Sequence, residues 1–101
     1  MINKKRLYNL LREIPKGKVS TYRELGRKLN TKSYQAVGQI LKRNEDPVTF
    51  PCYKIVNSNG NIGGYSGSNP KNILKKIKLL ARDGIKIKNK KIDLKKHLYK
   101  F

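Results

Sequence analysis

Residues 20–43, STYRELGRKLNTKSYQAVGQILKR, contain two short segments of helical periodicity separated by a polar turn. The first segment starts with Thr21 and has Glu24 three residues later, which is the capping-box pattern of a helix N-terminus. In that pattern the threonine hydroxyl caps a backbone N–H and the glutamate reaches back to the capping residue. We expect this helix to run to about Leu29.

The polar turn at residues 30–33 offers several N-caps for a second helix, which we predict over Tyr34 to Arg43. Two short helices joined by a tight polar turn form a helix-turn-helix pattern, in which the second helix faces DNA. The apolar side chains of this second helix share one face: Ala36, Val37, Ile40 and Leu41.

Amphipathic helices are predicted on both sides of this motif. One covers residues 5–14 and ends at Pro15–Gly17. The other begins near Asn69–Pro70, an N-cap followed by a first-turn proline, and stops at Gly84. Their expected buried side chains are Leu7, Leu10, Leu11 and Ile14 in the first, and Ile73, Leu74, Ile77, Leu80 and Ala81 in the second.

Extended segments are predicted in the second half of the chain. Cys52–Val56 is rich in β-forming residues and indicates a strand, and a glycine-rich loop follows at 61–67. Ile85–Ile87 alternates like an edge strand. The lysine-rich tail at 88–101 is expected to form a short hairpin and a helical turn, or to be frayed.

The length suits one compact domain, and we expect residues 1–101 to form it. The order of elements predicts a mainly α fold with a small β element, a winged-helix-like helix-turn-helix domain. No apolar run is long enough to span a membrane, and no signal-peptide pattern is present. We therefore expect a monomeric, cytoplasmic protein.

The charge is strongly positive, because 25 Lys and Arg residues face six Asp and Glu residues, for a formal net charge of +19. Such a field attracts polyanions, and nucleic acid held through its phosphates is the favoured partner. A ribosomal-type scaffold and an anionic membrane surface are the alternatives. The single cysteine, Cys52, excludes an internal disulfide and a zinc site of several thiolates.

Several segments resemble one family in their order and spacing. They are IPKGKVSTY at 14–22, AVG at 36–38, Asn44, PCYKIV at 51–56 and GYSG at 64–67. Over about residues 7–87 the chain resembles the catalytic domain of the O6-alkylguanine-DNA alkyltransferases, or methylated-DNA–protein-cysteine methyltransferases. We expect the N-terminal domain that many members carry to be absent, as it is in the related alkyltransferase-like proteins.

The resemblance implies single-turnover DNA repair. The O6-alkylguanine is rotated out of the duplex, a thiolate attacks the alkyl carbon, and guanine leaves. The stable thioether leaves the protein spent. The implied partner is DNA carrying O6-alkylguanine, bound through its phosphates and minor groove, and no metal or cofactor is implied.

The resemblance also assigns roles at the reaction centre. Cys52 matches the alkyl acceptor, and Asn44 matches an asparagine that braces the active-site turn. The carbonyl of Ile55 would contact the exocyclic amine of guanine. Tyr65 and Ser66 match a loop that covers the base. The alternative interpretation of Cys52 is a buried strand cysteine, since a lone cysteine is usually a small buried hydrophobe. The alternative for the glycine-rich segment is a flexible surface loop.

On the DNA-binding side, Tyr22 matches a tyrosine that crowds the 3′ phosphate and hydrogen-bonds the flipped guanine. Ala36 and Gly38 match small residues that let the recognition helix approach the minor groove. Gln35 stands where the family usually has an arginine that fills the vacated stack. Tyr34 would assist by stacking. Because Gln35 carries no charge, we expect slower base flipping or weaker lesion preference, and not loss of DNA binding.

Two further positions depart from the family pattern. Tyr53 replaces a histidine that relays a proton from the cysteine, and Asp83 replaces the glutamate that ends this relay. Tyrosine has an ordinary pKa near ~10 and is a poor base at neutral pH. A Tyr53–Asp83 hydrogen bond is a hypothesis that would keep the strand in place. His97, in the basic tail, is expected to be solvated and to have no catalytic role.

Three functions remain open on the sequence. An active transferase is favoured by Cys52, because alkyltransferase-like relatives typically have another residue there. A non-catalytic protein that flags O6-alkylguanine for other repair factors is favoured by Tyr53, Asp83 and Gln35. A general DNA-binding helix-turn-helix protein with an incidental cysteine is the third.

Overall fold

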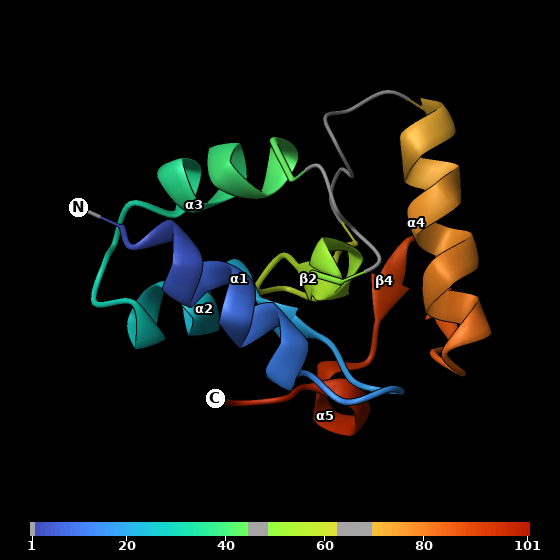
Figure 1. Cartoon of the computed structure of the whole chain (residues 1–101). Helices are drawn as coiled ribbons and strands as arrows, with labels where there is room; N and C mark the ends of the chain where they lie inside the picture. Colours follow the sequence, from blue (N-terminus) through green and yellow to red (C-terminus); the bar gives the residue numbers. More distant parts are fainter. Residues whose placement is uncertain (1, 45–48, 63–69) are drawn as a thin grey trace.

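The computed structural model describes residues 2–44, 49–62 and 70–101, without the side chains of residues 70–72. Helices α1, α2 and α3 gather on one side of a short central turn and strand, and α4 lies on the other side (Figure 1). The helices are α1 Lys4–Glu13, α2 Tyr22–Lys28, α3 Tyr34–Lys42, α4 Pro70–Arg82 and α5 Leu94–His97, with a 3-10 turn η1 at Cys52–Lys54. The strands are β1 Ser20–Thr21, β2 Ile55–Val56, β3 Ile87–Lys88 and β4 Lys91–Ile92.

Helix α1 forms as predicted, within one residue at each end. The Asn3 side chain caps it by accepting a hydrogen bond from the Arg6 backbone N–H at 3.1 Å. The helix ends at Ile14, whose backbone is extended as expected before a proline. Its buried stripe is Leu7, Leu10 and Leu11.

The helix-turn-helix motif is confirmed at α2 and α3, which pack against each other. Leu25 and Val37, one from each helix, are fully buried. The turn requires a glycine at position 26, because a Cβ there would lie 2.8 Å from the carbonyl oxygen of Thr31 and 2.7 Å from the ring of Tyr34. The close approach fixes the angle at which α3 leaves the turn.

The strand predicted over Cys52–Val56 is wrong in its first half. Cys52 and Lys54 donate their backbone N–H groups to the carbonyls of Phe50 and Pro51, so the chain turns here instead of extending. Only β2 is extended, and it pairs in parallel with β1. This pairing places the cysteine turn beside the start of α2.

The tail is ordered rather than frayed. Strands β3 and β4 form an antiparallel hairpin. The strand predicted at Ile85–Ile87 begins two residues later, at Ile87, and ends at Lys88. Beyond α5, Tyr99 donates its N–H to the Val19 carbonyl at 2.7 Å. His97, expected to be solvated, is buried at 6% exposure with Nδ1 3.1 Å from the carbonyl oxygen of Gly17.

Two predicted core positions of α4 are also wrong. Leu74 is 58% exposed, and Ala81 is exposed as well. At 100° per residue the buried stripe is centred near Leu80, which puts Lys76 inside it and the other two at its edge. Gly84 ends the helix as predicted, with a left-handed φ of +84°.

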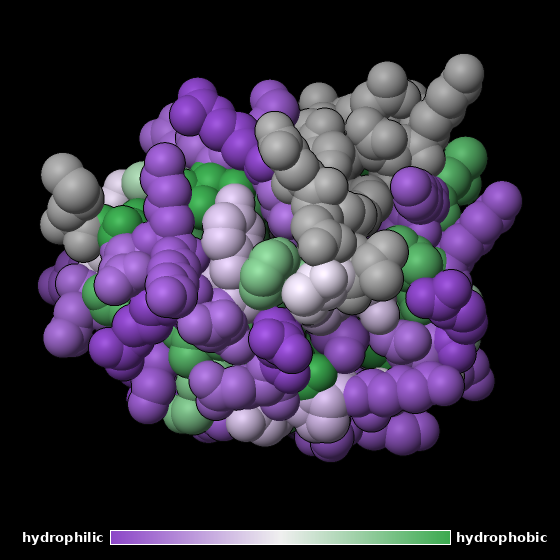
Figure 2. Space-filling view, viewed as in Figure 1, coloured by the Kyte–Doolittle hydropathy of each residue, from purple (hydrophilic) through white to green (hydrophobic). Residues whose placement is uncertain are grey.

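The surface is mainly hydrophilic. Hydrophilic side chains cover most of the face shown in Figure 2, and apolar ones appear in small separate patches. In the part of the chain that the structure describes, no helix is long and apolar enough to cross a membrane.

Candidate active site and nucleic-acid interface

Cys52 is the first residue of η1 and is 7% exposed. Its backbone N–H donates to the carbonyl of Phe50 at 2.8 Å. The side-chain amide of Asn44, just beyond α3, donates to the same carbonyl at 2.7 Å. Asn44 therefore connects the turn that contains Cys52 to the end of α3.

Lys76 is a charged side chain inside the site that the sequence analysis missed. It is 1% exposed, and its ammonium donates to the Ile55 carbonyl at 2.7 Å. Burial lowers the pKa of Lys76 to about 8, while the negative charge of a Cys52 thiolate acts in the opposite direction. Lys76 is thus a buried positive group whose pKa responds to the charge of Cys52.

A sequence signal for Lys76 existed. Ile73, Ile77 and Leu80 were predicted to be buried on α4, and position 76 lies three, one and four residues from them. The bond to Lys76 also occupies one lone pair of the Ile55 carbonyl. A carbonyl oxygen has two lone pairs, so this group can still accept a hydrogen bond from a base.

The lowered pKa of Lys76 predicts that stability rises with pH. An unfolded chain keeps this proton up to about pH 10.5, whereas the folded protein releases it near pH 8. Between these values the unfolded state binds more protons, so the free energy of unfolding increases. From about pH 7 to about pH 9.5, wild type should gain about 2 kcal/mol relative to Lys76→Met. Urea unfolding measures this, and identical pH dependence in both proteins would contradict it.

Tyr53 and Asp83 form the hydrogen bond that the sequence analysis hypothesised. The phenol donates to Oδ2 of Asp83 at 2.6 Å. Burial and then this bond raise the pKa of Tyr53 to about 12. Tyr53 therefore keeps its proton at neutral pH and cannot take one from the cysteine.

Lys54 is a second buried lysine of the site, and it lies in the η1 turn with Cys52 and Tyr53. Its ammonium donates to the Ile14 carbonyl at 2.9 Å, which ties η1 to the end of α1. Burial lowers the pKa of Lys54, and the Asp83 carboxylate opposes that change. The Tyr53–Asp83 pair thus contributes structure and compensating charge to this turn.

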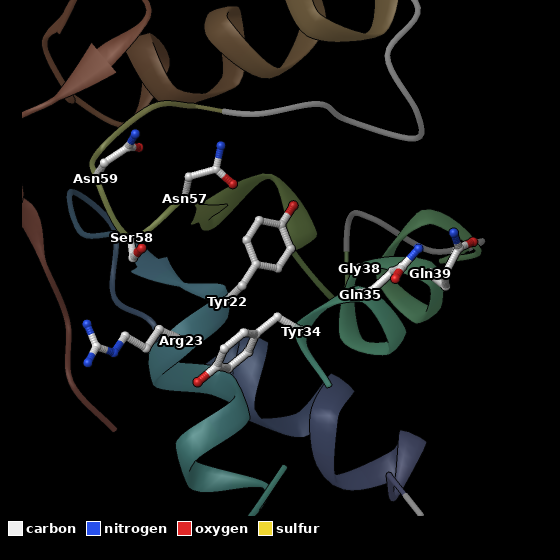
Figure 3. Close-up of a pocket in the computed structure, with 9 residues that line it drawn as sticks. All are labelled: Tyr22, Arg23, Tyr34, Gln35, Gly38, Gln39, Asn57, Ser58 and Asn59. Carbon is white, nitrogen blue, oxygen red and sulfur yellow. The ribbon is translucent and has the colours of Figure 1, made fainter. Parts of the chain in front are cut away.

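A cavity of about 890 Å³ opens between α2, α3 and the turn that follows β2. Figure 3 shows its side chains converging from these three elements. Four predicted DNA-binding residues line it: Tyr22, Tyr34, Gln35 and Gly38. Five lining residues were missed: Arg23, Gln39, Asn57, Ser58 and Asn59. Nothing in the sequence of a polar turn indicated that residues 57–59 would face the recognition helix.

Tyr22 links the cavity to the cysteine. Burial, and then the charge of a Cys52 thiolate, raise the pKa of Tyr22, so its hydroxyl remains a hydrogen-bond donor. A Cβ at Gly38 would lie 3.9 Å from the Tyr22 ring, which shows that the recognition helix passes directly over this ring.

Tyr34 and Ala36 are placed differently from the other predicted residues. The ring of Tyr34 extends from α3 towards α2, where it packs on Gly26 while remaining 42% exposed (Figure 3). Ala36 lies on another side of α3, in a smaller hollow with Ile2 and Ile40. The structure therefore does not bring Ala36 to the cavity, and Tyr65 and Ser66 lie outside the described residues.

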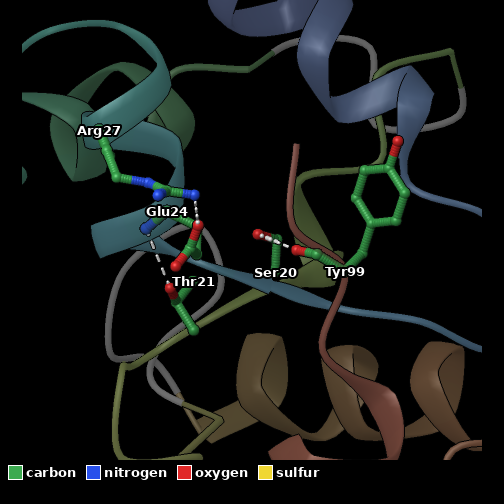
Figure 4. Close-up of polar contacts among 5 residues, drawn as sticks. All are labelled: Ser20, Thr21, Glu24, Arg27 and Tyr99. Atoms are coloured by element: carbon green, nitrogen blue, oxygen red, sulfur yellow. Dashed lines mark hydrogen bonds and ion pairs between the residues drawn. The ribbon is translucent and has the colours of Figure 1, made fainter.

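Strand β1 sets the position of Tyr22. Thr21 caps α2 by accepting from the Glu24 N–H at 3.1 Å, and Ser20 donates its hydroxyl to the Tyr99 carbonyl at 2.9 Å (Figure 4). The Glu24 carboxylate pairs with Arg27 at 2.7 Å, whereas the capping-box pattern directs it to the capping residue. The Thr21 cap and the bond of Ser20 to the tail therefore fix the chain immediately before Tyr22.

The family is shown by comparison with known proteins. The profile of the 6-O-methylguanine DNA methyltransferase DNA-binding domain matches residues 3–85. A bifunctional methyltransferase/endonuclease of Picrophilus torridus is 45% identical over 94 residues, covering 92% of this chain and 30% of that protein. A methylated-DNA–protein-cysteine methyltransferase of Candida glabrata is 39% identical over 92 residues, covering 90% and 42%. The chain belongs to the 6-O-methylguanine DNA methyltransferase family and spans less than half the length of these relatives.

Solved structures confirm the predicted fold class. S. pombe Atl1, in complex with damaged DNA containing O6-carboxymethylguanine, matches with a TM-score of 0.85 at 27% identity, covering 97% of this chain and 94% of that chain. The O6-methylguanine-DNA methyltransferase of Pyrococcus kodakaraensis matches with a TM-score of 0.69 at 38% identity, covering 81% and 46%.

Proposed function

We propose that this protein binds DNA at the cavity and transfers the alkyl group of O6-alkylguanine to Cys52 in a single turnover. The observation that carries the proposal is the buried side chain of Lys76, whose ammonium donates to the Ile55 carbonyl at the end of the cysteine turn and whose pKa a Cys52 thiolate would raise. A cysteine that serves only as a small buried hydrophobe needs no such partner. The family membership and the complexes of related proteins with DNA support the same conclusion.

The proposed step follows from the groups around the sulfur. The thiol releases its proton to solvent, and the Cys52 thiolate attacks the alkyl carbon. The S–C bond forms as the C–O6 bond breaks, and the electron pair passes to guanine, which takes up a proton from solvent. The Tyr22 hydroxyl, which stays protonated, donates a hydrogen bond to the leaving base. No metal is required by this step.

DNA binding is assigned to the cavity residues of α2 and α3. Arg23 offers a charged donor for a phosphate, and Gln35 and Gln39 present amides that can hydrogen-bond the base left unpaired. Because Gln35 has no charge, we expect weaker displacement of the base than an arginine would give. The net charge of +19 makes the binding strongly dependent on salt.

Tyr53→Phe should lower stability and leave the chemistry largely intact. The variant loses a hydrogen bond to a charged carboxylate, which contributes about 1.5–3 kcal/mol. The rate of methyl transfer should stay within about threefold of wild type, since a phenol with a pKa near 12 carries no proton for the thiol. Single-turnover kinetics and urea unfolding measure the two effects. A rate loss of about tenfold or more, corrected for folded fraction, would instead place Tyr53 in a proton relay.

Intact mass spectrometry after mixing with duplex DNA containing O6-methylguanine tests the proposed function. We expect the mass of one methyl group to be added, and the addition to disappear with undamaged DNA and with Cys52→Ala. Cys52→Ala should still bind the damaged duplex. An unchanged mass under these conditions would overturn alkyl transfer.

Non-catalytic lesion binding is the second candidate function. The high structural similarity to Atl1 bound to damaged DNA and the replacement of the family histidine by Tyr53 favour it. Tight binding that prefers O6-methylguanine, without any gain in mass, would establish this second function. Absence of both mass gain and lesion preference would leave a general DNA-binding protein.

A further inference from the structure

The hairpin of β3 and β4 concentrates positive charge on a tight turn. Asn89 and Lys90 form its two-residue loop, with left-handed φ values of +53° and +59°, as in a type I′ turn. Lys88 lies directly opposite Lys91 in the register, and all three lysines are exposed. The side chain of Ile92 in β4 is buried and anchors the hairpin to the core.

This arrangement is unfavourable for folding by itself. Like charges directly opposite on an antiparallel pair repel, and a lysine at a left-handed position is strained where glycine is preferred. Within the described part of α4 and the tail, both carboxylates are engaged elsewhere. Asp83 accepts from Tyr53, and Asp93 caps α5 by accepting from the Lys95 N–H. A polyanionic partner would relieve the repulsion that the fold leaves in place.

The hairpin is attached to the wall of the DNA-binding cavity. The Ile92 N–H donates to the Gly60 carbonyl at 2.8 Å, and the Ile62 N–H donates to the Lys90 carbonyl at 2.9 Å. These bonds connect the hairpin to residues 60–62. The preceding residues of the same segment, Asn57 and Asn59, line the cavity. In Figure 3 the hairpin strand lies just beyond the turn that carries Asn59. The backbone that carries the three lysines is therefore fixed relative to this turn.

We propose that Lys88, Lys90 and Lys91 form a second DNA contact, which binds the phosphate backbone flanking the nucleotide held in the cavity. The proposal rests on the proposed DNA binding and extends it beyond the helix-turn-helix. Three ammonium groups on a rigid turn suit a row of phosphates on one strand, because phosphate contacts need charge and no base-specific groups. Continuity with the cavity wall favours the flank of the same duplex over a separate partner.

The test measures the salt dependence of DNA affinity for the triple variant Lys88→Gln/Lys90→Gly/Lys91→Gln. Each phosphate contact contributes about 0.9 to the slope of log K against log salt, so the slope should fall by about 2 to 3. Between about 50 and about 200 mM salt, the variant should lose about 40-fold less affinity than wild type. Lys90→Gly alone should reduce the slope by about one without lowering Tm, because glycine suits the left-handed turn.

The matched control, Lys5→Gln/Arg12→Gln/Lys16→Gln, removes the same charge from exposed positions on and just after α1. This helix contacts α3 through the Tyr8 hydroxyl and the Ile40 carbonyl, away from the cavity, so its slope should change by less than about one. Equal slopes for wild type and the hairpin variant, or equal losses in hairpin and control variants, would overturn the proposal. Affinity is measured for both undamaged and damaged duplexes. If wild type binds the two duplexes equally well, that result counts against the proposed function and not against the hairpin contact. Two duplexes bound to each protein at saturation would contradict contact with the same DNA.

Discussion

Lys76→Met is expected to slow the reaction of Cys52 with a small alkylating reagent about tenfold at neutral pH. Loss of an attraction of about 2–3 kcal/mol between the ammonium and the sulfur lowers the thiolate population about 100-fold. The less acidic thiol is intrinsically more nucleophilic, and this offsets about tenfold of that loss. Rates measured by intact mass across a pH series should show the reactive form of Cys52 appearing at higher pH in the variant.

Lys54→Met is the matched control for this prediction. Lys54 is also a buried lysine bonded to a backbone carbonyl, but the charge that acts on it is Asp83. Its replacement should change stability without moving the pH profile of Cys52. If both variants slow the reaction equally, or if Lys76→Met leaves the profile in place, Lys76 has only a structural role.

Gly60→Ala is expected to destabilise the protein by about 3–4 kcal/mol. A left-handed φ of +89° costs an alanine about 1–2 kcal/mol. The new Cβ would also lie 2.6 Å from the carbonyl oxygen of Ile92, and the backbone must shift to accommodate it. For a domain of this size the loss corresponds to a decrease in Tm of about 12 °C or more. Thermal unfolding followed by circular dichroism measures it.

Gly84→Ala separates these two causes. Gly84 has a similar φ of +84°, but a Cβ there meets no atom within 4 Å. It should cost only the conformational penalty of about 1–2 kcal/mol. Equal losses in the two alanine variants would mean that the close approach of the Ile92 carbonyl to position 60 adds no steric cost.

The elements that the sequence predicted best are those that local chemistry decides. Thr21 caps α2 and the apolar period places Val37 in the core, and both signals lie within a few neighbouring residues. The η1 turn escaped prediction because the Phe50 carbonyl at its start is held by Asn44, a tertiary contact. A β-rich composition alone therefore indicated a strand where the hydrogen bonds make a turn.

The site was predicted in part for the same reason. Resemblance singled out Cys52, Asn44, Tyr22 and Gly38. In the structure Asn44 bonds to the turn of Cys52, and Tyr22 and Gly38 line one cavity. Lys76 was missed because its charge outweighed its place in the apolar period, and the carbonyl of Ile55 that accepts its hydrogen bond comes from a segment distant in the sequence. Residues 57–59 became site residues through the parallel pairing of β1 with β2, which a sequence of short strands does not specify.

The contacts of the tail with β1 have a consequence for biosynthesis. The Val19 carbonyl and the Ser20 hydroxyl bond to Tyr99, about eighty residues later in the chain. A nascent chain whose residues 98 and 99 are still inside the ribosomal tunnel cannot form these contacts, which hold the segment just before Tyr22. Contacts of such high sequence separation also form late in folding, since loop closure must precede them. The chain around Tyr22 is therefore held in place only after residues 98 and 99 have left the ribosomal tunnel.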